Sequence, residues 1–228
     1  MMLAQGRVSD FDPKMFMMQL VIVFGSIALH EFGHAKSADA AGDPTPRSQG
    51  RVTLNPLAHF DPLGALMILM MCYSGYGIGW GKPVMVNASR MRNPKWDEFM
   101  SVLWGPLVNL LLAIAFALIL RFVAKPSPDD ALTMFCFTGM WINISLCLFN
   151  LIPIGPLDGH WLLSTLLPSP YGMRYRIWSR TTGTLVLFGI ILADQFLFRN
   201  SGPGILASII GPPRDALLRM LLGPVFNG

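Results

Sequence analysis

The sequence predicts an all-α polytopic membrane protein with about four full transmembrane helices. Hydrophobic residues make up 53% of the 228 residues and charged residues only 13%, whereas an ordinary soluble domain has about 25% charged residues. Several apolar runs reach the roughly 20 residues that a helix needs to cross a ~30 Å hydrocarbon core. The Lys and Arg residues lie mostly between these runs, as membrane-flanking charges do.

We expect one transmembrane domain over residues 1–228, with its core in 15–165 and C-terminal helices in 175–222. No basic cluster is interleaved with aromatic residues, so nucleic acid is not an expected partner. The three cysteines lie within apolar runs and are odd in number, which predicts neither a disulfide framework nor a cysteine metal site. No cleavable signal peptide is expected, because the first apolar run carries the candidate chemistry.

The first apolar run, 15–38, contains His30, Glu31 and His34 in its second half. A charge at that depth costs roughly 2.5–3.5 kcal/mol, so it needs a partner. Positions i and i+4 share a helix face, so both imidazoles can point at one metal ion with Glu31 beside it. This is the H-E-x-x-H zinc-hydrolase pattern, with two ligands and a general base. The alternative is a hydrogen-bonded network without metal, which we favour less because these few polar groups share one membrane-length run.

The next segments are less regular. Residues 41–60 are rich in Gly, Pro, Asp and Ser, which predicts a loop with one short strand at 51–54. The apolar run 62–80 ends in a cluster of glycines, which favours a re-entrant segment over a full crossing. Residues 82–87 have valines at period two and a proline, which predicts a short membrane-associated β element at an edge.

The remainder of the chain predicts helices interrupted by one break. In order, these are spanning helices at 98–122 and 131–152, a break at 153–159, a short helix at 160–167, a further span at 181–198 and an amphipathic or interfacial segment at 203–222.

A catalytic zinc ion normally has three protein ligands and one open position. The candidates for the third ligand are Asp158, His59, Asp61 and His160. Asp158 follows a run of prolines and glycines, and broken backbone at membrane depth is tolerated only where it lines a cavity or is buried in protein. Asp158 could equally be the N-cap of the following helix. The residues alone favour neither interpretation.

Two motifs together resemble the site-2 proteases, which are intramembrane zinc metalloproteases. They are HEFGH on an early membrane helix and N-x-x-P-x-x-P-L-D-G at 150–159. NPLAHFDPLG at 55–64, GWGKPV at 79–84 and GPLVN at 105–109 resemble the compact prokaryotic branch of that family, without a PDZ or other regulatory domain. The resemblance covers roughly 24–163.

The resemblance implies that His30, His34 and Asp158 bind Zn2+ and that Glu31 is the catalytic base. It makes Asn150 a polar neighbour of the site that could donate a hydrogen bond to substrate. The implied activity is an intramembrane endopeptidase that hydrolyses transmembrane segments of membrane protein substrates, as in regulated intramembrane proteolysis. The implied surroundings are the lipid bilayer and, in addition to substrate, a possible membrane protein complex partner.

The strand predicted at 82–87 could receive an unwound substrate by strand addition, with Lys82, Val84 and Val86 as its candidate contacts. His59 and Asp61 could orient groups near the site, but capping and positioning of the re-entrant segment is the favoured interpretation.

Three more polar residues, His160, Asn109 and Asn143, lie in or beside the predicted helices. His160 departs from the family, which often has a small residue there, so its role is left open. Asn109 and Asn143 are expected to join helices rather than to touch substrate.

Topology separates the two interpretations of 62–80. If this run crossed the membrane, the His pair and Asp158 would lie at opposite faces, too far apart for one ion. A re-entrant run returns them to one side and gives that side ten Lys and Arg residues against seven. The positive-inside rule then places the active site toward the cytosolic face. The resemblance to prokaryotic members implies that the membrane is the plasma (inner) membrane.

Two alternatives of other classes remain. One is a non-catalytic zinc-binding structural subunit or assembly partner of a membrane complex. The other is a transporter that relays protons or metal, which the single HExxH and the lack of a duplicated half disfavour.

Overall fold

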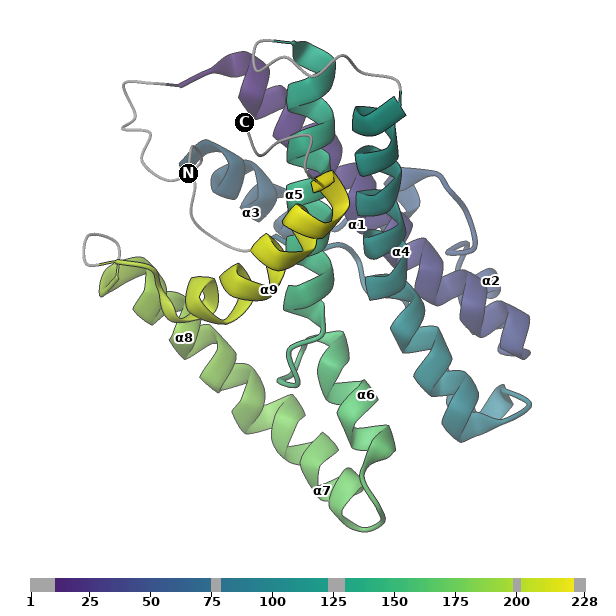
Figure 1. Ribbon diagram of the computed structural model, residues 1–228. Coiled ribbons are helices and arrows are strands. Elements are labelled where there is room, and N and C mark those ends of the chain that lie inside the picture. The colour runs from purple at the N-terminus through teal and green to yellow at the C-terminus, as the bar shows by residue number, and fades with distance from the viewer. Residues whose placement is uncertain (1–10, 75–78, 123–129, 199–201, 224–228) are drawn as a thin grey trace.

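The computed structural model describes residues 11–74, 79–122, 130–198 and 202–223. Within those ranges all regular secondary structure is helical (Figure 1). Three helices there are long and apolar enough to cross a membrane, namely α1 (Pro13–Ala41), α4 (Pro94–Phe122) and α5 (Ala131–Asn150). The predicted all-α membrane class is supported, with three such helices where the sequence predicted about four spans.

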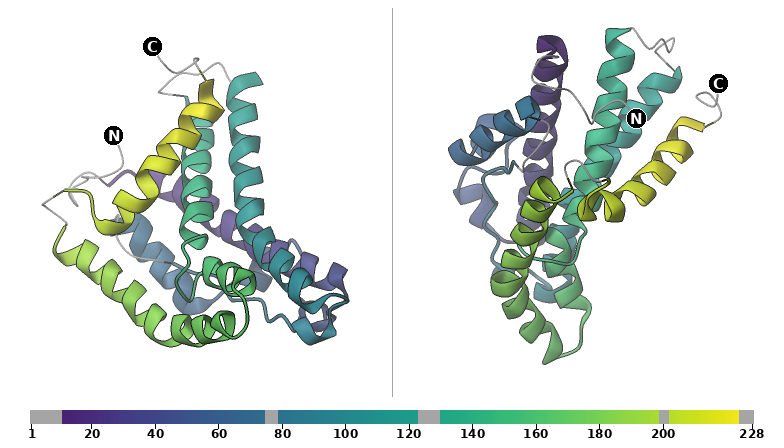
Figure 2. Two further views of the ribbon diagram at one scale, coloured as in Figure 1. Left: turned by 60° about the horizontal axis from the view of Figure 1, so that its bottom comes forward. Right: turned by 90° about the vertical axis from the view of Figure 1, so that its left-hand side faces the viewer.

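Helices α1, α4 and α5 pack side by side at the centre of the molecule (Figure 2). Helices α1 and α4 approach closely at Gly33, where an added Cβ would lie 2.9 Å from the Trp104 carbonyl oxygen. The core between α4 and α5 is built from small and aliphatic side chains: Ala113, Ala117, Leu120, Cys136, Met140 and Ile144. Leucines of α9 (Ile205–Leu222) cover the same core. These contacts fix the central helices against one another.

The segment 62–80 returns to the place where it began. Its helix, α3 (Pro62–Ser74), has 13 residues and a length of about 20 Å, less than the ~30 Å hydrocarbon core. After it, the Lys82 N–H donates to the His59 carbonyl at 2.9 Å. The Trp80 carbonyl oxygen packs on Gly64, 2.0 Å from where a Cβ would stand. The two ends of the segment therefore lie side by side.

The structure has no strand at 82–87 or at 51–54, and none elsewhere in the ranges it describes, so the expected β element is not found. A strand needs a partner ladder, whereas the N–H groups after α3 bond to a loop and to side chains. The Lys82 N–H donates to the His59 carbonyl, the Val84 N–H to the Glu31 carboxylate, and the Asn87 N–H to the Asp43 carboxylate.

Short helical turns connect the longer elements. They are α2 (Thr45–Ser48), η2 (Pro56–His59) and η3 (Ala88–Arg90).

The chain breaks after α5 and resumes at α6 (Asp158–Leu166), as the sequence predicted but starting two residues earlier. Helix α7 (Tyr171–Trp178), the π-turn η4 (Ser179–Gly183) and α8 (Thr184–Phe196) follow without interruption and form one long helical stretch in Figure 1. The further span predicted at 181–198 thus corresponds to α8, which has 13 residues of its own.

Candidate metal centre

The structure brings together His30 and His34 of α1 and Asp158 at the start of α6. Their ligand atoms all lie within 4.8 Å of one another. The Asp158 Oδ2 atom is 3.2 Å from His30 Nε2 and 3.4 Å from His34 Nε2, and the two Nε2 atoms are 3.0 Å apart. The break between α5 and α6 therefore carries a carboxylate back to the middle of the first helix.

The two imidazoles are oriented by oxygen atoms of α4. His30 Nδ1 lies 2.7 Å from Asn109 Oδ1, and His34 Nδ1 lies 2.8 Å from the Ser101 carbonyl oxygen. The Asn109 amide is itself oriented, because its Nδ2 donates to Asn143 Oδ1 at 3.0 Å. Both ring partners are acceptors, so we assign the proton of each neutral ring to Nδ1. Both Nε2 lone pairs then face Asp158.

This arrangement fits a bound cation better than a metal-free hydrogen-bonded cluster. Two unprotonated Nε2 atoms cannot hydrogen bond to each other, and the buried Asp158 Oδ2 receives no hydrogen bond from any residue the structure describes. Three lone-pair donors facing one point are a typical ligand set for catalytic zinc. Oxygen partners on the far ring nitrogens are also typical of metal-binding histidines.

Asp158 is not used as a helix cap. The N-cap of α6 is Leu157, and no side chain caps that end. The Asp158 carboxylate is therefore available as a ligand, and the capping alternative is not realised.

Glu31 lies on α1 between the two histidines in sequence. Its Oε2 accepts a hydrogen bond from the Val84 N–H at 3.1 Å. The predicted base is thus held by backbone that follows the 62–80 segment.

Comparison with known proteins identifies the family. The model described as Peptidase family M50 matches residues 122–192, which include Asp158. The chain is 32% identical over 219 residues to the Bacillus subtilis (strain 168) protein named "Putative zinc metalloprotease YwhC", across 92% of this chain and 94% of that protein. The chain belongs to peptidase family M50.

More distant relatives agree with this assignment. The chain is 28% identical over 167 residues to "Putative zinc metalloprotease Rip2" of Mycolicibacterium smegmatis, across 73% of this chain and 63% of that protein. It is 25% identical over 203 residues to "Putative zinc metalloprotease sll0528" of Synechocystis, across 80% of this chain and 45% of that protein. No solved structure gives a significant match. The predicted membership of the site-2 proteases is confirmed, and with it the expectation of a zinc metalloprotease.

Two other candidate ligands of this M50 peptidase have structural partners away from the centre. Asp61 Oδ1 accepts from the Gly64 N–H at 2.7 Å and so caps α3. His59 is buried, with Nε2 2.9 Å from the Thr53 carbonyl oxygen, and its own carbonyl accepts from Lys82. Both residues position the 62–80 segment, which agrees with the favoured interpretation from sequence.

The remaining predicted residues also bond or pack locally. His160 is buried, with Nδ1 2.5 Å from the Leu157 carbonyl oxygen. Asn150 Nδ2 donates to the Leu146 carbonyl of its own helix at 3.0 Å, and the substrate role predicted for it stays a prediction. Val86 packs on a small core formed by Ala38, Ala41 and Met91.

The sequence reasoning missed the groups that orient the histidines. Asn109 was expected to join helices, and it does bond to Asn143, but it also holds His30. The GPLVN motif that contains it was a usable signal. Ser101 accepts through its backbone carbonyl, which every residue has, so the amino-acid type at this position could not predict the contact.

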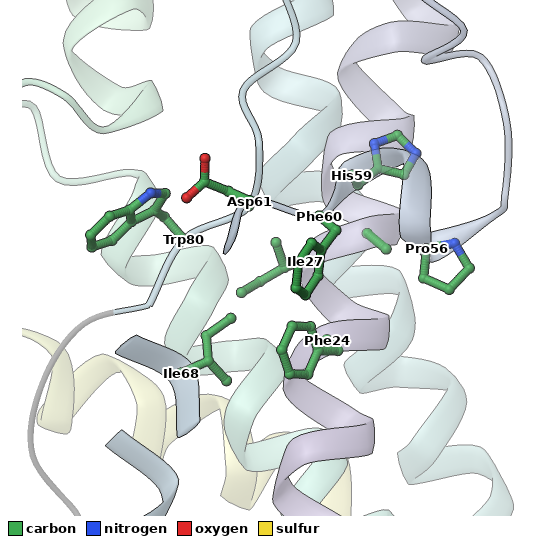
Figure 3. A pocket seen from close by; sticks show the side chains of 10 residues that line it. Phe24, Ile27, Pro56, His59, Phe60, Asp61, Ile68 and Trp80 are labelled. Atoms are coloured by element: carbon green, nitrogen blue, oxygen red, sulfur yellow. The ribbon is translucent and has the colours of Figure 1, made fainter. Parts of the chain in front are cut away.

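A small pocket lies between α1, η2 and α3 (Figure 3). Its lining combines apolar side chains with those of His59 and Asp61. Phe24 and Phe60 stack across it with ring centroids 6.2 Å apart. Gly81 forms part of its wall and lies against Glu31, because an added Cβ would stand 3.5 Å from Glu31 Cγ. The wall of this pocket is therefore in contact with the predicted base at Gly81.

Because Gly105 has no side chain, the two imidazoles fit against its backbone. A Cβ at this position would lie 2.3 Å from His34 Cε1 and 2.4 Å from His34 Nε2. We expect Gly105→Ala to displace the His34 ring and to weaken zinc binding by at least about tenfold. Loss of a group that only hydrogen bonds to a metal ligand already lowers metal affinity by ~10–100-fold. Titration of the purified protein with zinc measures this.

Gly25→Ala is the matched control, because a Cβ added there on α1 meets nothing within 4 Å. Zinc affinity should stay unchanged in this control. Equal zinc affinity in the Gly105 and Gly25 variants would contradict the placement of the His34 ring.

Proposed function

We propose that this M50 peptidase is a zinc-dependent endopeptidase that hydrolyses peptide bonds in transmembrane segments of membrane proteins. One observation carries the proposal: His30 and His34 lie on α1, a helix of membrane-spanning length, and Asp158 at the start of α6 converges on them. Glu31 is next to His30 on that helix. A peptidase site built on such a helix is suited to substrates that share its lipid environment.

The chemistry divides between the metal and this chain. Zinc held by His30, His34 and Asp158 would lower the pKa of water and polarise the scissile carbonyl. Glu31 accepts the proton of the attacking water and returns it to the leaving amine. The Val84 N–H occupies Oε2, so we assign the proton transfer to Oε1. Asn109 and Ser101 keep both rings in the tautomer that binds metal.

Substrate must be unwound before its backbone can react. A helical segment hides its peptide groups in its own hydrogen bonds, and an exposed stretch of enzyme backbone can replace them. Residues 82–87 lie beside Glu31, and Met85 there is 62% exposed. Substrate would lie along this stretch and contact Lys82, Val84 and Val86 through groups that the bonds to His59, Arg51 and Glu31 leave free.

Substrate class can be tested with two reporters that carry the same scissile sequence. One holds it within a transmembrane helix and the other in a soluble, unstructured linker. We expect the purified enzyme in liposomes to cleave the membrane reporter at least about tenfold faster, because binding and orientation in the bilayer raise the effective concentration. Faster cleavage of the soluble reporter would contradict an intramembrane substrate.

We further propose that the 62–80 segment is re-entrant, that α7 to α8 supplies a further crossing and that the metal centre opens toward the cytosolic face of the plasma membrane. The side-by-side ends of the 62–80 segment and the excess of ten Lys and Arg over seven support this. Cysteines at positions 89 and 201 should then react with a membrane-impermeant reagent from opposite faces. Labelling of both from one face would overturn this topology.

A further inference from the structure

Arg51 is a buried arginine between the two ends of the 62–80 segment. It is 3% exposed. Its Nη1 donates to the Ala58 carbonyl and its Nη2 donates to the Lys82 carbonyl. Its Nε has no hydrogen-bond partner among the residues that the structure describes. A buried guanidinium without a bonded carboxylate is costly, so its place in the fold requires a compensating interaction.

Glu31 supplies part of that compensation at a distance. Burial lowers the pKa of the Arg51 guanidinium, and the negative charge of Glu31 acts in the opposite direction. The buried cation and the predicted base therefore interact without a direct hydrogen bond.

A short backbone path connects the guanidinium to the base. Arg51 holds the Lys82 carbonyl, and the Lys82 N–H bonds to the His59 carbonyl at 2.9 Å. Two residues later the Val84 N–H donates to Glu31 Oε2 at 3.1 Å. Movement of Lys82 would therefore move the donor that orients Glu31.

We propose that Arg51 is a positioning residue of this peptidase. It ties residues 58 and 82 together and thereby fixes the Val84 N–H that orients Glu31. The inference rests on the proposed role of Glu31 as the base.

The test compares Arg51→Gln and Arg51→Lys in the full-length protein. Arg47→Gln is the matched control, because the Arg47 side chain is 71% exposed and pairs with Asp39 at the surface. Three quantities are measured: backbone amide exchange in residues 79–87, zinc bound per chain, and kcat and KM on the membrane reporter.

For Arg51→Gln we expect amide exchange in 79–87 to accelerate about tenfold, because the tie that limits local opening is lost. Zinc content stays at the wild-type level. The kcat falls about 10–100-fold with KM within about threefold, as misplacement of a catalytic group predicts. Arg51→Lys restores most of both losses, because an ammonium can donate to two carbonyls. Arg47→Gln behaves as wild type.

Wild-type exchange in 79–87 for Arg51→Gln would overturn the proposal, as would a Lys variant as impaired as the Gln variant. So would loss of zinc in parallel with kcat, because that pattern indicates general destabilisation. Amide exchange does not depend on turnover. Faster exchange together with a fully active Glu31→Gln enzyme would therefore contradict the role of Glu31 while supporting the tie itself.

Discussion

Replacing Glu31 by glutamine is expected to reduce kcat on a membrane reporter by about a thousandfold, since general acid–base groups contribute ~10²–10⁴-fold. The glutamine amide oxygen can still accept the Val84 N–H, so the local structure is retained. It cannot accept the proton of the attacking water. Zinc bound per chain should be unchanged, because Glu31 is not among the converging ligand atoms.

The control for this variant is Asp39→Asn on the same helix. Asp39 pairs with Arg47, away from the metal centre, and its loss should change kcat less than about twofold. A Glu31→Gln enzyme with wild-type turnover would contradict the assigned base. Such a result would favour the alternative of a structural zinc-binding subunit, which needs no base.

Removal of the Asp158 carboxylate is expected to have the second large effect. Asp158→Ala leaves only two imidazole ligands, so zinc affinity should fall by at least about 100-fold. That is the largest loss typical of removing a group that only hydrogen bonds to a metal ligand. Proteolysis should fall with zinc occupancy, and a chelator should abolish it in the wild type. Zinc titration alongside reporter cleavage measures both effects.

Asp61→Asn is the matched control for Asp158→Ala. Asp61 was also a candidate ligand, but it caps α3, and asparagine can keep that cap. Its zinc affinity should match the wild type. If Asp61→Asn lost zinc and Asp158→Ala did not, the third ligand would be misassigned.

The local part of the site was predictable because helical spacing is a property of the sequence itself. His30 and His34 share a face at i and i+4 in any helix, so their convergence required no tertiary information. Asp158 was ambiguous between ligand and cap, because only the packing of α6 against α4 separates the two. For Asn109 only the helix-joining role was predicted. Its hydrogen bond with His30 depends on where α1 meets α4, which the sequence does not give.

The fold was predictable where length and hydropathy suffice. The apolar runs located α1, α4 and α5, and the proline–glycine break located the start of α6. The strand prediction at 82–87 failed because alternating valines indicate only that a stretch can be extended. They do not show whether a second strand lies beside it. The neighbours of that stretch are a loop carbonyl and two carboxylates. The helix across 171–196 was underestimated because its first turns have exposed residues at both apolar and polar positions.

We infer that one zinc ion is bound by His30, His34 and Asp158. Anomalous diffraction at the zinc absorption edge, from crystals of the purified full-length protein, tests it most directly. We predict one peak per chain within bonding distance of both Nε2 atoms and an Asp158 carboxylate oxygen. A fully occupied peak elsewhere, or the absence of any peak in protein that cleaves the membrane reporter, would show that these three residues do not hold the catalytic metal.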